Sequence, residues 1–145
     1  LEDGELTLTT EGSNGFGAAG FGVPANKTFA EIESISTDFD FTTGDCGAGT
    51  PRFCVRFEGR DDCACAQIQT DLCDEPSELE GNSGNLIGNN TSGTWFRICA
   101  DGPNINTYED ALEEYGDEVI RSIFVVADVS NGAQTVTLVP CISFA

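Results

Sequence analysis

The sequence predicts a mostly β protein, an antiparallel β-sandwich with one short helix in a connection. Segments in which apolar and polar residues alternate recur along the chain, and residues typical of turns separate them. Helical periodicity is clear in one segment, residues 107–115. The length of 145 residues suits a single domain over residues 1–145 with a substantial core.

The first half of the chain contains three predicted strands. Residues 5–9 alternate as a strand, whereas the glycine-rich residues 12–22 predict a loop or irregular edge that could act as a flexible arm. Residues 28–41 predict the second strand, with Ile35, Thr37, Phe39 and Phe41 on one face. The third covers residues 52–57 and points Phe53, Val55 and Phe57 inward.

A tight turn after this third strand predicts a disulfide. With Gly59 and Arg60 at the centre of a two-residue hairpin, Cys54 faces Cys65 across the strand pair, within disulfide reach. Cys63 points to the same side as Cys65 and needs a different partner, for which Cys73 is the nearest candidate.

The second half begins with a polar segment, residues 74–92, which predicts a long ordered loop. A strand follows at residues 95–99. The helix over residues 107–115 opens with a capping box and ends before Gly116. Residues 119–129 are apolar on both faces, as expected of a central strand, and residues 135–144 predict the last strand.

Several local strings carry a family resemblance. Residues 20–39, 42–57, 84–88, 107–128 and 132–138 resemble a recurrent class of secreted domains of unknown function in bacterial and fungal extracellular proteins. The resemblance implies a jelly-roll-like sandwich and no particular reaction or ligand. The chain departs from that class in two ways, because its loop after Asp128 is shorter and its cysteines are more numerous.

Composition excludes several functions. The 25 acidic residues against 6 basic ones give a formal charge of −19, so nucleic acid and anionic membrane surfaces would repel the chain. No stretch is apolar enough to insert into a membrane. The chain has no His, which removes imidazole bases, the usual catalytic triads and His metal ligands, and we expect no enzymatic activity.

Cysteines and glycosylation sequons favour an extracellular protein, secreted or held at the cell surface. The seven cysteines lack zinc-site spacing and predict a disulfide framework. Sequons at Asn26, Asn89 and Asn90 agree with export, although Asn89 and Asn90 overlap. Because the chain contains no Met, we expect that an N-terminal segment, most commonly a signal peptide, has been removed.

Calcium is the metal that the acidic residues favour. Asp38, Asp40 and Asp45 flank one predicted turn and Asp128 lies near another, so loops could together supply the oxygen ligands of a Ca²⁺ site. The alternative is a diffuse acidic surface. The hypothesis of a carboxylate pair that hydrolyses glycosidic bonds is weaker than the calcium hypothesis, because neighbouring acidic residues are unavoidable in so acidic a chain.

Two functions from different classes remain. We favour a non-enzymatic extracellular structural protein that could assemble into oligomers or filaments by exchange of the strand in residues 1–22. The alternative is that this strand pairs within its own sandwich. The rival function is a glycan-binding module, which could depend on calcium, in which Trp95 stacks on a sugar, although a buried position is commoner for a Trp in a sandwich.

Overall fold

The computed structural model describes residues 4–10, 15–44, 46, 50–67, 82–85, 95–98, 105–129 and 132–145. In chain order the elements are β1 (Leu6–Thr9), β2 (Phe16–Phe21), the 3₁₀ helix η1 (Phe29–Glu31), β3 (Ile32–Thr43), β4 (Arg52–Phe57), β5 (Cys63–Gln67), β6 (Asn82–Asn85), β7 (Trp95–Ile98), α2 (Tyr108–Tyr115), β8 (Ile120–Asp128) and β9 (Thr135–Phe144). The predicted mostly β fold is therefore confirmed.

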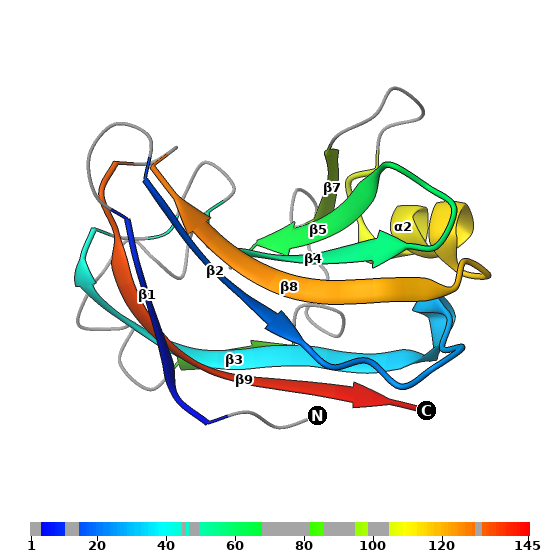
Figure 1. Ribbon diagram of the computed structural model, residues 1–145, viewed down its shortest axis with the longest axis horizontal. Helices are drawn as coiled ribbons and strands as arrows, with labels where there is room; N and C mark the ends of the chain where they lie inside the picture. The colour runs from blue at the N-terminus through cyan, green and yellow to red at the C-terminus, as the bar shows by residue number, and fades with distance from the viewer. Residues whose placement is uncertain are drawn as a thin grey trace.

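The strands form two antiparallel sheets packed face to face (Figure 1). One sheet has the order β1-β9-β3-β6 and the other the order β2-β8-β4-β5-β7. As predicted, β8 is a central strand, and β9 also has neighbours on both sides. The strands β1 and β2 lie at sheet edges.

The pairings are nested around the hairpin of β4 and β5. Moving outward along the chain, β3 pairs with β6, β2 with β8, and β1 with β9. The sheets are completed by β3 with β9 and β4 with β8. This is the connectivity of one long hairpin folded over into a sandwich, and it brings both ends of the chain to one sheet.

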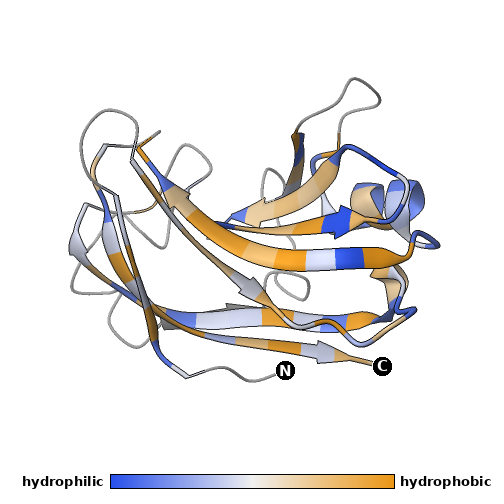
Figure 2. Ribbon diagram, in the orientation of Figure 1, coloured by the Kyte–Doolittle hydropathy of each residue, from blue (hydrophilic) through white to orange (hydrophobic). Residues whose placement is uncertain are grey.

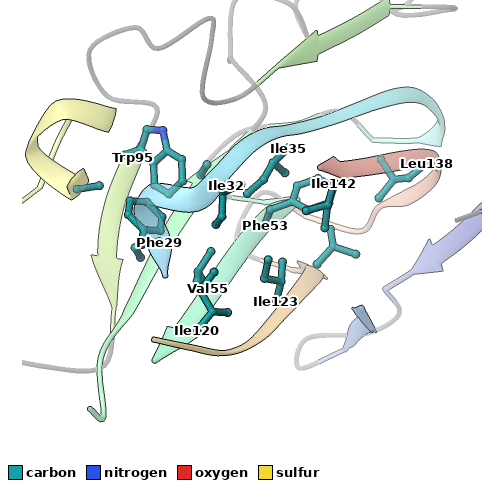
Figure 3. Packing of buried hydrophobic residues seen from close by; sticks show 14 of the residues in the cluster. Phe29, Ile32, Ile35, Phe53, Val55, Trp95, Ile120, Ile123, Leu138 and Ile142 are labelled. Atoms are coloured by element: carbon teal, nitrogen blue, oxygen red, sulfur yellow. The ribbon is translucent and has the colours of Figure 1, made fainter. Parts of the chain in front are cut away.

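The core lies between the sheets and follows the strand alternation. In β9 every second residue from Val136 to Ile142 is buried, whereas β8 buries three residues in succession at 125–127. Figure 2 shows apolar residues recurring along both strands. Figure 3 shows the packing of this core, whose fully buried large side chains include Phe29, Phe53, Ile123, Leu138 and Trp95. The inward positions predicted for β4 are confirmed.

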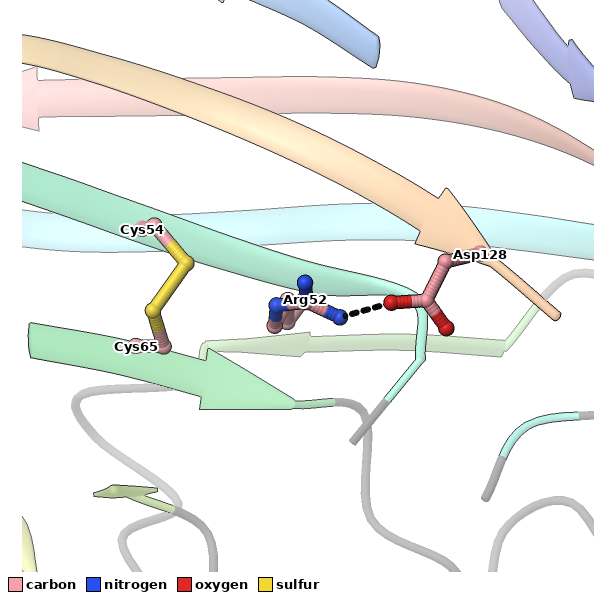
Figure 4. Close-up of a disulfide and its surroundings, with 4 residues drawn as sticks. All are labelled: Arg52, Cys54, Cys65 and Asp128. Carbon is pink, nitrogen blue, oxygen red and sulfur yellow. Dashed lines mark hydrogen bonds and ion pairs between the residues drawn. A yellow bond between two sulfur atoms is a disulfide. The ribbon is translucent and has the colours of Figure 1, made fainter. Parts of the chain in front are cut away.

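The predicted hairpin register and disulfide are both confirmed. Cys54 lies opposite Cys65, and their sulfurs are bonded at 2.08 Å (Figure 4). Gly59 has φ +74°, the left-handed backbone that the turn requires of its first central residue. These cysteines face away from the other sheet and are nonetheless fully buried with Cys63, against Phe96, Ile98 and Phe124.

The single α-helix of the described residues ends where predicted, at Tyr115, and begins at Tyr108 with Thr107 as its N-cap. The Thr107 hydroxyl accepts a hydrogen bond from the Asp110 amide, and the Asp110 carboxylate accepts one from the Thr107 amide. A Cβ at Gly116 would lie 2.5 Å from the Leu112 carbonyl oxygen, so only glycine fits this helix end.

Three elements differ from the sequence prediction. Residues 16–21, expected within a loop or irregular edge, form a regular six-residue strand on β8. Residues 82–85 form a short strand on β3 inside a segment expected to be a loop. The predicted strand over residues 28–41 starts at Ile32, because the capping box of Thr28 and Glu31 folds the preceding turn as 3₁₀ helix.

Candidate functional site

The edge strand β1 is the candidate site. Leu8 is 5% exposed and belongs to the main core, and Leu6 packs against it, whereas Thr7 and Thr9 face solvent. The backbone of β1 pairs with β9 alone among the described strands. Alternation therefore gives this short segment a buried face and a regular ladder, the two features of a strand that can add to a sheet.

A buried polar network holds the C-terminal end of β1. The Thr10 amide donates to the Gln134 carbonyl at 2.8 Å, and the Gln134 amide donates to the Thr10 hydroxyl at 2.7 Å. The Gln134 side chain, fully buried, bonds Thr50, whose hydroxyl also accepts from the Asp128 amide. The network joins β1 to the ends of both sheets and satisfies groups that would be costly to bury alone.

Close packing of β1 against β2 depends on one glycine. A Cβ at Gly17 would lie 3.2 Å from both the amide nitrogen and the carbonyl oxygen of Thr9. Strand β1 can therefore cross near β2, as Figure 1 shows, because Gly17 has no side chain there.

A shallow open groove of about 270 Å³ lies on the outer face of the β1 sheet. Its lining consists of Glu5, Asp38, Phe39, Asp40, Thr137 and Val139. The strand register explains this grouping, since Asp38 lies opposite Val139 and Asp40 opposite Thr137. Three carboxylates give the groove a negative potential suited to cations.

The structure brings together only part of the predicted calcium set. Asp38 and Asp40 share the groove, but Asp128 ends a strand of the other sheet and pairs with Arg52 at 2.8 Å (Figure 4). Asp45 lies outside the described residues. Within the described ranges, no group of three or more His, Cys, Asp or Glu side chains is placed to hold a metal.

The calcium prediction has a direct thermal test. A specific site stabilises the fold by RT ln(1 + [L]/Kd), about 1.4 kcal/mol at a calcium concentration about ten times Kd. Calcium is expected to raise Tm above sodium at matched ionic strength, and the Asp38→Asn, Asp40→Asn double variant is expected to lose this rise. Equal Tm values in calcium, magnesium and sodium would instead indicate screening of surface charge.

Trp95 is the site prediction that the structure corrects. Its side chain is 1% exposed and packs edge-on against Phe29, with ring centroids 5.6 Å apart (Figure 3). Trp95 also packs against Tyr108, with ring centroids 6.0 Å apart. The indole therefore belongs to the core and presents no open face on which a sugar could stack.

The remaining predicted sites fall partly outside the described residues. Asn26 is exposed in a turn with φ +61°, accessible as a glycosylation acceptor, and its modification stays a prediction. Asn89, Asn90 and Cys73 lie outside the described residues, so their predicted roles, including the pairing of Cys73 with Cys63, also stay predictions. Cys46 takes part in a disulfide that the sequence did not assign.

Sequence reasoning also missed a charged cluster beside α2. Arg60 donates two hydrogen bonds of 2.8 Å to the Asp62 carboxylate, and Tyr115 donates a third of 2.7 Å. Arg97 lies 3.3 Å from Asp62 and 3.1 Å from Glu114. Both guanidinium groups stack over the Tyr115 ring.

Hydrogen bonds and burial shift the pKa values in this cluster. The hydrogen bonds from Arg60 lower the pKa of Asp62 to about 2, and those from Arg60 and Arg97 lower the pKa of Glu114. Burial, followed by the bond to Asp62, raises the pKa of Tyr115 well above its ordinary value. These shifts keep the acids ionised and the phenol neutral, as expected of a structural clamp that fixes α2 to the β5 and β7 strands.

Comparisons with models of protein families, with curated proteins and with solved structures found no match to this chain. In the part of the chain that the structure describes, no helix has the length and apolar character needed to span a membrane.

Proposed function

We propose that this chain is an exported, non-enzymatic structural protein that assembles with copies of itself by exchange of strand β1. One observation carries the proposal: β1 is an edge strand whose interactions are all ones that another copy could supply. It contributes Leu8 to the core, a backbone ladder to β9 and Thr10 to a buried network. A β1 strand from a second copy would reproduce each of these contacts.

The chain around β1 supports exchange. Only residues 11–15 join the donated segment, which ends with Thr10, to β2, and extended they reach about 17 Å, enough to redirect the strand toward a neighbour. Each copy would then donate one strand and accept one. Such a contact is head-to-tail, and a rotation that does not close the ring produces a filament.

Export is supported by the cysteines. The Cys54–Cys65 disulfide and the disulfide of Cys46 need an oxidising compartment to form and persist. The nested pairing around β4 and β5 supports a jelly roll as the fold of the module, with β7 as an added edge strand. A stapled sandwich of this kind suits an extracellular scaffold.

Cysteine cross-linking in the full chain tests exchange. Thr7 lies opposite Thr137, with their hydroxyl oxygens 3.2 Å apart, so cysteines at both positions can form a disulfide. Chains carrying Thr7→Cys are mixed with chains carrying Thr137→Cys, each in a Cys141→Ser background, and oxidised. Exchange predicts a disulfide-linked pair between the two chain types, and covalent ladders from the double variant.

A matched mixture checks the register. Ser143 lies farther along β9, opposite Ser34 of β3, so Thr7→Cys mixed with Ser143→Cys is expected to give no specific product. The proposal is wrong if the double variant yields only an intramolecular disulfide and the mixed single variants stay unlinked.

A further inference from the structure

The edge strand β2 differs from the rest of this acidic surface. It pairs with β8 in an unbroken register, and no other described strand pairs along its far edge. Proteins usually protect such edges with charged residues, proline or bulges. Residues 12–26 contain no charged side chain, although the chain carries a formal charge of −19.

The exposed side of β2 also carries an unusual aromatic side chain. Phe16 is 71% exposed, the most exposed large apolar residue among those described. Ala18 and Gly20 are exposed on the same face, and a Cβ at Gly20 would meet no atom within 4 Å. The edge is thus uncharged, regular and apolar, with open space beside its glycine.

We infer that β2 pairs antiparallel with β2 of a second copy, about a two-fold axis through Ala18. This contact is independent of strand exchange, because it uses the opposite sheet and neither donates nor displaces a strand. It would join two five-stranded sheets into one continuous sheet.

The side-chain alternation limits the register, and the position of Phe16 then selects one. A two-fold axis normal to the sheet keeps the outer faces of both copies on one side, so opposed residues must both point outward or both inward. With the axis at Ala18, this residue lies opposite its own copy and Phe16 lies opposite Gly20 of the second copy. Each edge phenylalanine side chain then covers an edge glycine.

The neighbouring strand supplies a surface for that ring. Gly20 lies opposite Phe124 of β8, whose half-buried ring is on the same outer face. Phe16 of the second copy, placed over Gly20, therefore reaches the edge of the Phe124 ring. Two such contacts, related by symmetry, would remove both exposed phenylalanine side chains from water.

Charge identifies the occupant of this edge as another copy. The rest of the surface of a second copy is acidic and would be repelled, whereas two uncharged β2 edges bring no ionised groups together. Long-range repulsion between the copies remains, so added sodium chloride is expected to strengthen the dimer.

Cross-linking at the axis tests the proposed register. In a Cys141→Ser background, Ala18→Cys is expected to give a disulfide-linked dimer on oxidation, because the two introduced side chains face each other. Gly20→Cys is the control, since in this register it faces Phe16 and is expected to form no disulfide-linked dimer. Equal cross-linking of both variants, or of neither, would overturn the register.

Sedimentation measures the dimer itself. The intact chain is expected to show a reversible pairing step, in addition to any assembly through β1, that Ala18→Glu weakens by roughly a hundredfold in Kd, since two carboxylates would face each other. Leu112→Glu makes the same charge change at an exposed apolar site on α2 and is expected to leave Kd unchanged. Equal effects of the two variants would refute the β2 contact without bearing on exchange of β1, whereas a chain that stays monomeric at high salt would refute both contacts.

Discussion

Replacing Asp62 by Asn is expected to lower the free energy of unfolding by about 3 to 5 kcal/mol. The Asp62 side chain is 4% exposed and receives hydrogen bonds from Arg60 and Tyr115, while Arg97, 6% exposed, also faces it. Asparagine keeps the shape and removes the negative charge. It therefore leaves a buried guanidinium with only Glu114 as its counter-ion.

Asp61→Asn provides the comparison, because this neighbouring carboxylate is exposed. Urea denaturation of both variants is expected to show a large loss for Asp62→Asn and a change within about 0.5 kcal/mol for Asp61→Asn. Similar small losses for both would show that the charged cluster does not stabilise the fold.

The difference in unfolding free energy between the intact chain and Asp62→Asn should depend on pH. The hydrogen bonds from Arg60 lower the pKa of Asp62 from 3.8 to about 2, and the folded state therefore prefers the ionised carboxylate. This preference contributes about 2 kcal/mol, fully present above pH 3.8 and lost as pH falls through about 2. The stabilities of the intact chain and Asp62→Asn are thus expected to converge as pH falls through this range.

The parts of the fold that sequence could predict are those with strong local signals. The two-residue turn at Gly59 fixes the β4–β5 register, and that register alone places Cys54 opposite Cys65. The helix could be predicted for a similar reason, since Thr107 and Asp110 cap it and apolar residues recur on one face. Each of these signals operates within about a dozen residues.

The elements that sequence reasoning missed have no local signal. Strand β2 is built of glycine, alanine and two phenylalanine residues, and β6 is Asn, Ser, Gly and Asn, so neither shows a useful alternation. Both are strands because a partner strand supplies the ladder, β8 in one case and β3 in the other. Glycine and alanine favour strands only in such a context.

The candidate site was likewise only partly predictable. The alternation of Leu6 and Leu8 identified β1 as a strand, but its anchor joins Thr10 to Gln134 and Thr50, which are far apart along the chain. The charged cluster likewise joins distant parts of the chain, since Arg97 contacts Asp62, which also pairs with Arg60. In a chain with 25 acidic residues, no sequence pattern distinguishes the buried Asp62 from acidic residues on the surface.

Trp95→Ala is expected to cost about 3 to 5 kcal/mol of unfolding free energy. The indole is 1% exposed and contacts Phe29 and Tyr108, so its removal opens a cavity where η1, β7 and α2 meet. Phe29 also packs on Phe57 and Tyr115, and the loss is therefore expected to loosen α2 as well as β7.

Phe16→Ala deletes an aromatic side chain that is 71% exposed and is expected to change the unfolding free energy of the monomer by less than about 0.5 kcal/mol. Near-UV circular dichroism adds a second readout, because the one Trp of the chain reports its own fixed surroundings. The contrary result is a strong near-UV Trp signal in the intact chain while Trp95→Ala loses no more unfolding free energy than Phe16→Ala does. That result would mean that the core tolerates the cavity, and it would contradict the prediction for Trp95. Because the ring is enclosed, any loss of polysaccharide binding in Trp95→Ala should follow the fraction unfolded rather than the loss of a contact surface.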